Sequence, residues 1–201
     1  MWVLLALFLQ YFLYYYLLPF EATIGYDKET KTNIMKAKDF FNLEKDFHFA
    51  QSFDLEKAPW EWVSSIKGAL EGLDFSRSEK YDIPSSLFVG KNVFFGKNVK
   101  LPHSGTIEGP AYIGDGTILR PNVYVRENVI VGKNCVLGNA CEFKNALLLN
   151  RVQVPHFNYV GDSILGNSAH LGAGVILANL RLDQTPVRIK FQGEFFDTGL
   201  R

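Results

Sequence analysis

The sequence predicts an all-β protein, a three-sided parallel β-helix, because an apolar residue returns at every sixth position over a long central segment. Neither the 3.6-residue period of a helix nor the two-residue period of a strand gives this spacing, whereas a coil with three short, flat faces does. Three six-residue repeats make one coil of about 18 residues, and coils stack about 4.8 Å apart like strands in a sheet. The apolar series is Val89, Phe95, Leu101, Ile107, Ile113, Leu119, Val125, Val131, Leu137, Phe143 and Leu149.

The residues between these apolar positions suit tight corners and a narrow interior. Asparagine, which tolerates positive φ, recurs at corner positions. These corner residues are Asn92, Asn98, Asn122, Asn128 and Asn134. A second inward position, four residues after each apolar one, holds a small or branched residue, as in Val93, Val99, Ala111, Thr117, Val123, Val129, Cys135 and Cys141. Two steps of five residues, Leu149 to Val154 and Val160 to Leu165, predict tightened corners or small bulges.

Composition argues against several classes of protein. The 21 basic and 21 acidic residues balance, and no long basic run predicts a nucleic-acid partner. Cys135 and Cys141 both occupy the small inward position, so we interpret them as buried core thiols in a reducing compartment. His103, His156 and His170 lack the paired spacing of a zinc site, so no metal is expected.

The N-terminal segment 1–34 allows two interpretations. Residues 1–20 carry no charge and are long enough to span a bilayer as one helix. Four lysines between positions 28 and 38 follow them and would keep the rest of the chain on the cytoplasmic side. In the alternative interpretation, Met35 is the true start and the segment 1–34 is a mis-assigned leader. Both interpretations leave the remaining chain cytoplasmic.

Residues 35–86 are expected to form an N-terminal extension with one amphipathic helix over 59–73. Pro59 suits the first helical position. We expect this helix to cap the β-helix, because an end coil exposes strand edges and interior that need cover. Residues 87–201 form the predicted β-helix, and the stretch after Leu182 reads as a loop or hairpin. The apolar side of the helix comprises Trp60, Val63, Ile66, Leu70 and Leu73.

Three motifs lie close together between Glu142 and Asn179: E-F-K-N, V-P-H-F-N-Y-V-G-D-S and L-G-A-G-V-I. At these spacings the segment resembles the acetyltransferase domain of the bifunctional N-acetylglucosamine-1-phosphate uridyltransferase / glucosamine-1-phosphate acetyltransferase. It also resembles the β-helix tails of related sugar-phosphate nucleotidyltransferases. The resemblance implies a left-handed β-helix, a homotrimer, and acetyl-CoA-dependent N-acetyl transfer to an amino-sugar 1-phosphate such as glucosamine-1-phosphate. Such a reaction belongs to UDP-N-acetylglucosamine biosynthesis.

The resemblance also implies roles for single residues. His156 matches the general base, which removes a proton from the attacking sugar amine. Lys144, twelve residues earlier, matches the lysine that binds the sugar phosphate. The family's arginine lies one full coil before that lysine, at the position of Arg126 here, whereas the Arg-Pro dipeptide that marks it lies at Arg120. Arg126 is preferred because one coil would stack it on Lys144, and Arg120 stays the rival candidate.

Further positions match the substrate and acetyl-CoA contacts of the family. Tyr159 and Asn179 match residues that position the sugar amine. Ala173, Asn179 and Leu180 fall where the family contacts acetyl-CoA. His170 stands at a substrate-side position that is asparagine in the family, and the segment after Asn179 departs from the family motif.

A non-enzymatic alternative remains. No glycine-rich nucleotide-binding segment precedes the β-helix, and the coils that complete the CoA site in the family are absent after Arg201, as in a truncated copy. A β-helix scaffold, or a remnant of a sugar-phosphate nucleotidyltransferase, therefore competes with the acetyltransferase. Acyl transfer to another sugar nucleotide is a third hypothesis.

Overall fold

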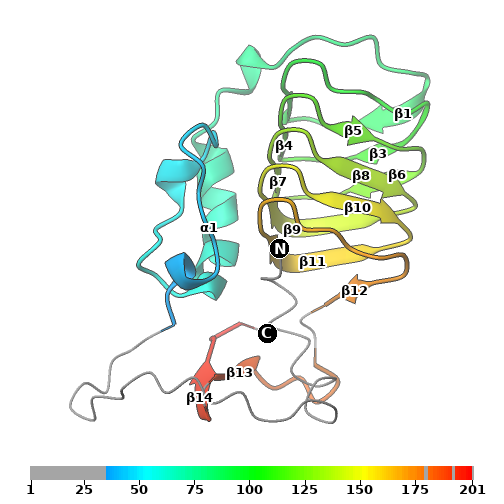
Figure 1. The fold of residues 1–201 in the computed structure, drawn as a ribbon. Helices are drawn as coiled ribbons and strands as arrows, with labels where there is room; N and C mark the ends of the chain where they lie inside the picture. The colour runs from blue at the N-terminus through cyan, green and yellow to red at the C-terminus, as the bar shows by residue number, and fades with distance from the viewer. Residues whose placement is uncertain (1–34, 179–180, 192, 201) are drawn as a thin grey trace.

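The computed structural model describes residues 35–178, 181–191 and 193–200, and within them the protein is a left-handed parallel β-helix flanked by a helical extension (Figure 1). This confirms the predicted fold class. The leader 1–34 and two candidate site residues, Asn179 and Leu180, lie outside the described residues. Across the described ranges, no helix combines the length and hydropathy that crossing a bilayer requires.

Short parallel strands stack into three faces, which we call face A, face B and face C. Strands β9 and β11 turn the corner from face A to face B and so link the two faces in one sheet. Face A contains β1 (Ser86–Val89), β3 (Ser104–Ile107), β6 (Val123–Val125), the first part of β9 (Glu142–Leu148), the first part of β11 (Tyr159–Leu165) and β12 (Ile176–Leu177). Face B contains β2 (Val93–Phe95), β4 (Ala111–Ile113), β7 (Val129–Val131) and the second parts of β9 and β11. Face C contains β5 (Ile118–Leu119), β8 (Val136–Asn139) and β10 (Gln153–His156).

The stacking register shortens along the chain and corrects one sequence prediction. Val125 pairs with Phe143 one regular coil later, but Val131 pairs with Leu148, one position short of a regular coil. One residue is therefore missing at the corner after Phe143, so Leu148 packs inside the β-helix and Leu149 packs outside it, under the extension. The first five-residue step runs from Phe143 to Leu148, and the expected step from Leu149 to Val154 is wrong. The second step, Val160 to Leu165, is confirmed by the pairing of Leu165 with Leu148.

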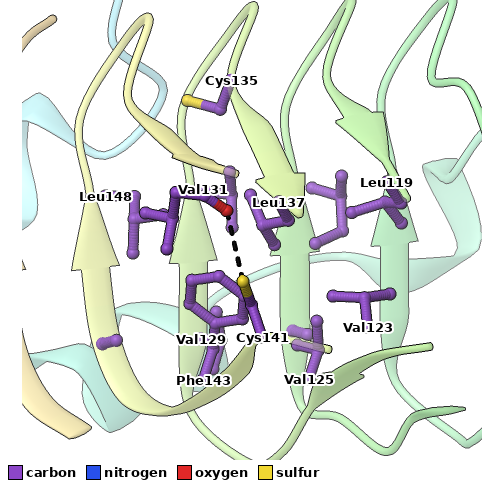
Figure 2. Close-up of a cluster of buried hydrophobic side chains, with 14 of the residues drawn as sticks. Leu119, Val123, Val125, Val129, Val131, Cys135, Leu137, Cys141, Phe143 and Leu148 are labelled. Atoms are coloured by element: carbon purple, nitrogen blue, oxygen red, sulfur yellow. Dashed lines mark hydrogen bonds between the residues drawn. The ribbon is translucent and has the colours of Figure 1, made fainter. Parts of the chain in front are cut away.

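The corners and the interior follow the predicted pattern. All five corner asparagines have φ between 55° and 60°. The large and small inward side chains interdigitate in one buried cluster, in which Val129, Leu137 and Phe143 point inward from different strands (Figure 2). Cys135 and Cys141 are free, buried thiols, as predicted, and burial raises the pKa of Cys135 to about 12.

The N-terminal extension covers face B and does not cap an end of the β-helix. Helix α1 (Pro59–Glu71) contacts β7, β9 and β11 along their outer side (Figure 1). Trp62 lies on its buried side together with Val63, Ile66 and Leu70, whereas Trp60 is only half-buried. The expected cap at an end is therefore wrong, because the outer side chains of face B are themselves apolar and need cover. The expected helix is confirmed, although it ends at Glu71 and Trp62 takes the buried place expected for Trp60. The extension also contains three 3-10 turns, η3 (Ala37–Asp39), η4 (Ala50–Ser52) and η5 (Phe75–Arg77).

Polar contacts fix the extension at the corner between faces B and C. The Glu44 carboxylate accepts hydrogen bonds from the Arg151 guanidinium and from the Asn150 amide, the latter at 2.8 Å. These contacts, Arg151 first, lower the pKa of Glu44 to about 2. Lys133 and Asp46 form a second ion pair at 2.9 Å. The register of the β-helix thereby also sets the position of the extension.

Segments outside the coils contact the first coil and the N-terminal extension. The Tyr81 hydroxyl donates to the Gly96 carbonyl at 2.7 Å and accepts from the Val99 amide at 2.9 Å, so it satisfies backbone groups of the first coil. After the last coil, β13 (Arg188–Phe191) and β14 (Glu194–Asp197) form an antiparallel hairpin, as predicted for this stretch. Its Phe191 ring contacts Phe40 of the extension edge-on at 6.2 Å.

We expect the two neighbouring tryptophans of α1 to differ sharply in their effect on stability. Trp62 is 1% exposed, stacks on Phe41 at 5.2 Å and donates from Nε1 to the Asp54 carbonyl at 2.7 Å. Trp62→Ala should destabilise the fold by about 3–5 kcal/mol. The matched control Trp60→Ala should cost less than about 1 kcal/mol. Thermal and urea unfolding measure both, and equal losses would contradict the packing of α1 on face B.

Candidate functional site

The outer side of face A carries two parallel rows of side chains. Alternate residues of a strand point outward, and the stacked register aligns them coil after coil. The first row contains mostly aromatic and apolar residues, together with one threonine and one carboxylate. It comprises Phe88, Thr106, Tyr124, Glu142, Tyr159 and Ile176.

The second row brings two of the candidate residues together. Arg126 follows Val125, which pairs with Phe143, and the Arg126 amide donates to the Phe143 carbonyl at 2.8 Å. Arg126 and Lys144 therefore occupy neighbouring coils at the same position, at the corner between faces A and B. Their backbone positions are therefore stacked as expected, and the joint role of the two cations in phosphate binding stays a prediction. Among the described residues, Lys144 forms no ion pair.

Arg126 is held by carboxylates in the structure. Its Nη1 donates to Glu142 Oε1 at 3.0 Å, and its Nε lies 3.6 Å from Glu127 Oε2. The hydrogen bond to Glu142 is the main reason why the pKa of Arg126 is raised. An anion that binds Arg126 must therefore compete with Glu142. Glu142 was not predicted as a site residue from the sequence, although its place in E-F-K-N, two positions before Lys144, is a signal that could have revealed it.

The rival Arg120 lies at a different corner. It directly follows β5 of face C, and its amide donates to the Leu137 carbonyl at 2.8 Å. One repeat separates Arg120 from Arg126, so the width of face A lies between them. The structure thus places Arg126, and not Arg120, beside Lys144.

His156 lies at the corner between faces C and A, at the end of β10. Its side chain is exposed, and its ring centroid is 6.4 Å from that of Phe157, which is itself exposed. His156 and Lys144 therefore flank face A at its two opposite edges. His170 pairs with Gln153 through an isolated bridge, so it lies on face C of the following coil.

The loop that carries Ala173 lies next to the His156 corner. Ala173 is exposed, and the Gly174 amide donates to the His156 carbonyl at 3.3 Å. Gly174 has a φ of +77°, which explains the glycine there. Gly172 has no such φ, and a side chain added to it would meet no atom within 4 Å. This loop therefore exposes its backbone beside the candidate base.

The Tyr159 ring lies across face A over Gly161. A Cβ atom at position 161 would come within 2.6 Å of both Cε1 and the hydroxyl oxygen of Tyr159. Gly161 is in register with Lys144 of the previous coil. The hydroxyl of Tyr159 consequently points along the face toward the row of Arg126 and Lys144. A site with two cations, a phenol and an exposed imidazole can hold a phosphorylated polar molecule and accept a proton from it.

Comparisons with known proteins agree with this architecture. Residues 107–192 match the family model described as GMPPB C-terminal domain. The chain is 31% identical over 143 residues to the bifunctional sugar-1-phosphate nucleotidylyltransferase/acetyltransferase of Sulfurisphaera tokodaii, covering 71% of this chain and 35% of that protein. It is 31% identical over 139 residues to the bifunctional protein GlmU of Methanococcus vannielii, covering 67% and 32%.

Most of the β-helix is therefore similar to the GMPPB C-terminal domain. Over the same region the chain is similar to GlmU-type bifunctional proteins. A shorter match, 41% identical over 51 residues, links 25% of this chain with 12% of the GlmU protein of Methanococcus maripaludis. The chain spans about a third of the length of the first two relatives.

We expect Gly161→Ala to displace the Tyr159 ring from face A. The ring is the free end of a flexible, partly exposed side chain, so it should turn away at a cost of about 1 kcal/mol or less of folding free energy. The control Gly172→Ala, which adds a methyl group in open space, should change stability by less than about 0.5 kcal/mol. In the double variant Tyr159→Ala, Gly161→Ala, the loss at position 161 should largely disappear. Additive losses in this cycle, followed by thermal unfolding, would show that the ring does not lie over Gly161.

Proposed function

We propose that the protein is an acetyl-CoA-dependent N-acetyltransferase that acts on an amino-sugar 1-phosphate such as glucosamine-1-phosphate. One observation carries the proposal: stacked Arg126 and Lys144 line one edge of face A, and an exposed imidazole, His156, lies at the other edge. The relative from Sulfurisphaera tokodaii is named as an acetyltransferase, which supports the same reaction type. UDP-N-acetylglucosamine biosynthesis is the corresponding pathway.

The phosphate of the acceptor binds at the corner between faces A and B. Lys144 supplies a point charge, and Arg126 supplies a planar guanidinium that can bind two phosphate oxygens. Phosphate carries up to two negative charges and so replaces Glu142 on Arg126. Tyr159 lies over the sugar between this corner and His156, and its hydroxyl offers a hydrogen bond to the acceptor.

His156 acts as the general base. The amine nitrogen attacks the thioester carbonyl, a C–N bond forms and the C–S bond breaks. The imidazole of His156 takes the proton that the amine loses and passes it to the departing CoA thiolate. The proton therefore ends on the sulfur of free CoA, and the imidazole returns to its neutral form.

Acetyl-CoA is the co-substrate, and the loop 172–174 is its proposed contact. The open space at Gly172 fits a ligand that approaches the backbone closely. Ala173 would offer its backbone to the acetyl-CoA chain, as would Asn179 and Leu180. His170 is proposed to contact substrate from face C. We propose that the protein is a cytoplasmic homotrimer, with neighbouring subunits completing each site.

A non-catalytic β-helix scaffold is the second candidate. The observation that favours it is the pairing of Arg126 with Glu142 at 3.0 Å and with Glu127 at 3.6 Å, because these carboxylates compensate the arginine. In a scaffold, these ion pairs would be surface contacts of small energetic value.

Release of free CoA thiol tests the proposed reaction. The full-length protein should consume acetyl-CoA only when glucosamine-1-phosphate is present. His156→Ala should reduce kcat by on the order of 100-fold or more, because the proton acceptor is lost. The control His103→Ala removes another exposed imidazole, ahead of β3 in the first coils, and should leave kcat nearly unchanged. Turnover that survives in His156→Ala would rule out His156 as the base.

Substitution of the two candidate arginines should have different effects on the affinity for the acceptor. Arg126→Ala should raise KM for glucosamine-1-phosphate on the order of 10-fold or more, because one partner of the phosphate is lost. Arg120→Ala, one repeat away at another corner, should leave that KM nearly unchanged. Steady-state kinetics at saturating acetyl-CoA give both values. The reverse pattern would place the phosphate at Arg120.

A further inference from the structure

Asn158 is a polar residue inside the β-helix, at a position that neighbouring coils fill with less polar side chains. It is 3% exposed and belongs to the series of small inward residues at the corner between faces C and A. The equivalent positions in the other coils are Leu87, Gly105, Val123, Cys141 and Val175. The other coils form this corner without a side-chain amide. Packing alone therefore does not explain why position 158 carries one.

The amide makes hydrogen bonds to three successive coils. Its Oδ1 accepts from the backbone amide of His156 at 3.3 Å and from Cys141 Sγ at 3.6 Å. Its Nδ2 donates to the Gly172 carbonyl at 2.6 Å and contacts the Val175 carbonyl at 3.4 Å. One buried side chain thus connects the His156 corner directly to the loop that starts at Gly172.

The two connected elements are the exposed parts of the candidate site. His156 offers the imidazole, and Gly172–Gly174 offers open backbone next to it. The Gly174 amide reaches the His156 carbonyl at 3.3 Å, so Asn158 is the inner of two links between them. A satisfied hydrogen-bond network of this kind fixes geometry more strongly than apolar packing does, because its directions are specific.

We propose that Asn158 is a positioning residue that holds His156 and the loop 172–174 in one fixed arrangement, so that both face the same reacting group. The proposal rests on the proposed acetyl transfer, in which His156 accepts the proton and the loop contacts acetyl-CoA. Asn158 is buried and acts only through these two neighbours. Its loss lets the corner and the loop move independently, which misplaces the base relative to the thioester.

The test compares two buried substitutions of the same kind in the full-length protein. Asn158→Val introduces the residue that Val123 and Val175 show to fit this corner. The control Thr117→Val removes another buried side chain that hydrogen-bonds, to the Gly132 carbonyl at 3.0 Å and from the Cys135 amide at 3.1 Å, at a different corner. Both variants should melt at a lower temperature than the wild type, since each loses buried hydrogen bonds.

The two variants should differ at the site. Hydrogen exchange of the His156 and Gly174 amides should accelerate on the order of 10-fold in Asn158→Val and stay unchanged in Thr117→Val. In acetyl transfer, Asn158→Val should lower kcat on the order of 10-fold at unchanged KM for glucosamine-1-phosphate, whereas Thr117→Val keeps wild-type kcat. If Asn158→Val does not fold, Asn158→Thr is measured in the same way, because threonine already occupies a small inward position at Thr117.

The outcomes separate the two proposals. Wild-type exchange at His156 and Gly174 in a folded Asn158 variant overturns the positioning role, and so does wild-type kcat. If the wild-type protein itself transfers no acetyl group, the proposed function fails, and the exchange measurement alone still decides whether Asn158 couples the corner to the loop.

Discussion

The number of residues in each coil governs both the interior and the outer surface of this β-helix. Parallel pairing one regular coil apart, shortened by one position from β9 onward, decides which side chains point inward and which residues lie above one another. In a β-helix, a shift of one residue would exchange the inner and outer sides of a strand. Lys144 follows Arg126 by one regular coil, and for this reason the two residues occupy the same position in neighbouring coils.

The shortened coil also gives face A and face B different outer surfaces. Leu147 and Leu149 become outer residues of face B, where together with Ile130 and Ile164 they form the surface that α1 covers. Face A keeps an outer surface of aromatic, basic and acidic side chains, because α1 packs on face B instead. The extension therefore stabilises one side of the β-helix and leaves the candidate site open on another.

Much of this arrangement could be predicted from the sequence, since repeats are local. The six-residue period, the corner asparagines and the buried cysteines all follow from side-chain size and φ preference, and the structure confirms them. The position of α1 could not be predicted, because the period does not say which outer side is covered. Leu149 led to the wrong five-residue step because an apolar residue fits both the interior of the β-helix and the outer side that α1 covers. Asn158 could have been noticed as a polar residue at a position where the repeat places small inward side chains. The repeat alone does not say what such a residue does.

A crystal structure of the full-length protein with glucosamine-1-phosphate and CoA would show directly whether face A holds the acceptor. We expect the phosphate between Arg126 and Lys144, the Tyr159 ring over the sugar, and the amine facing His156 beside the loop 172–174. Glu142 should have released Arg126. Ligand density on face C around Arg120, with the ion pair between Arg126 and Glu142 intact, would contradict this expectation.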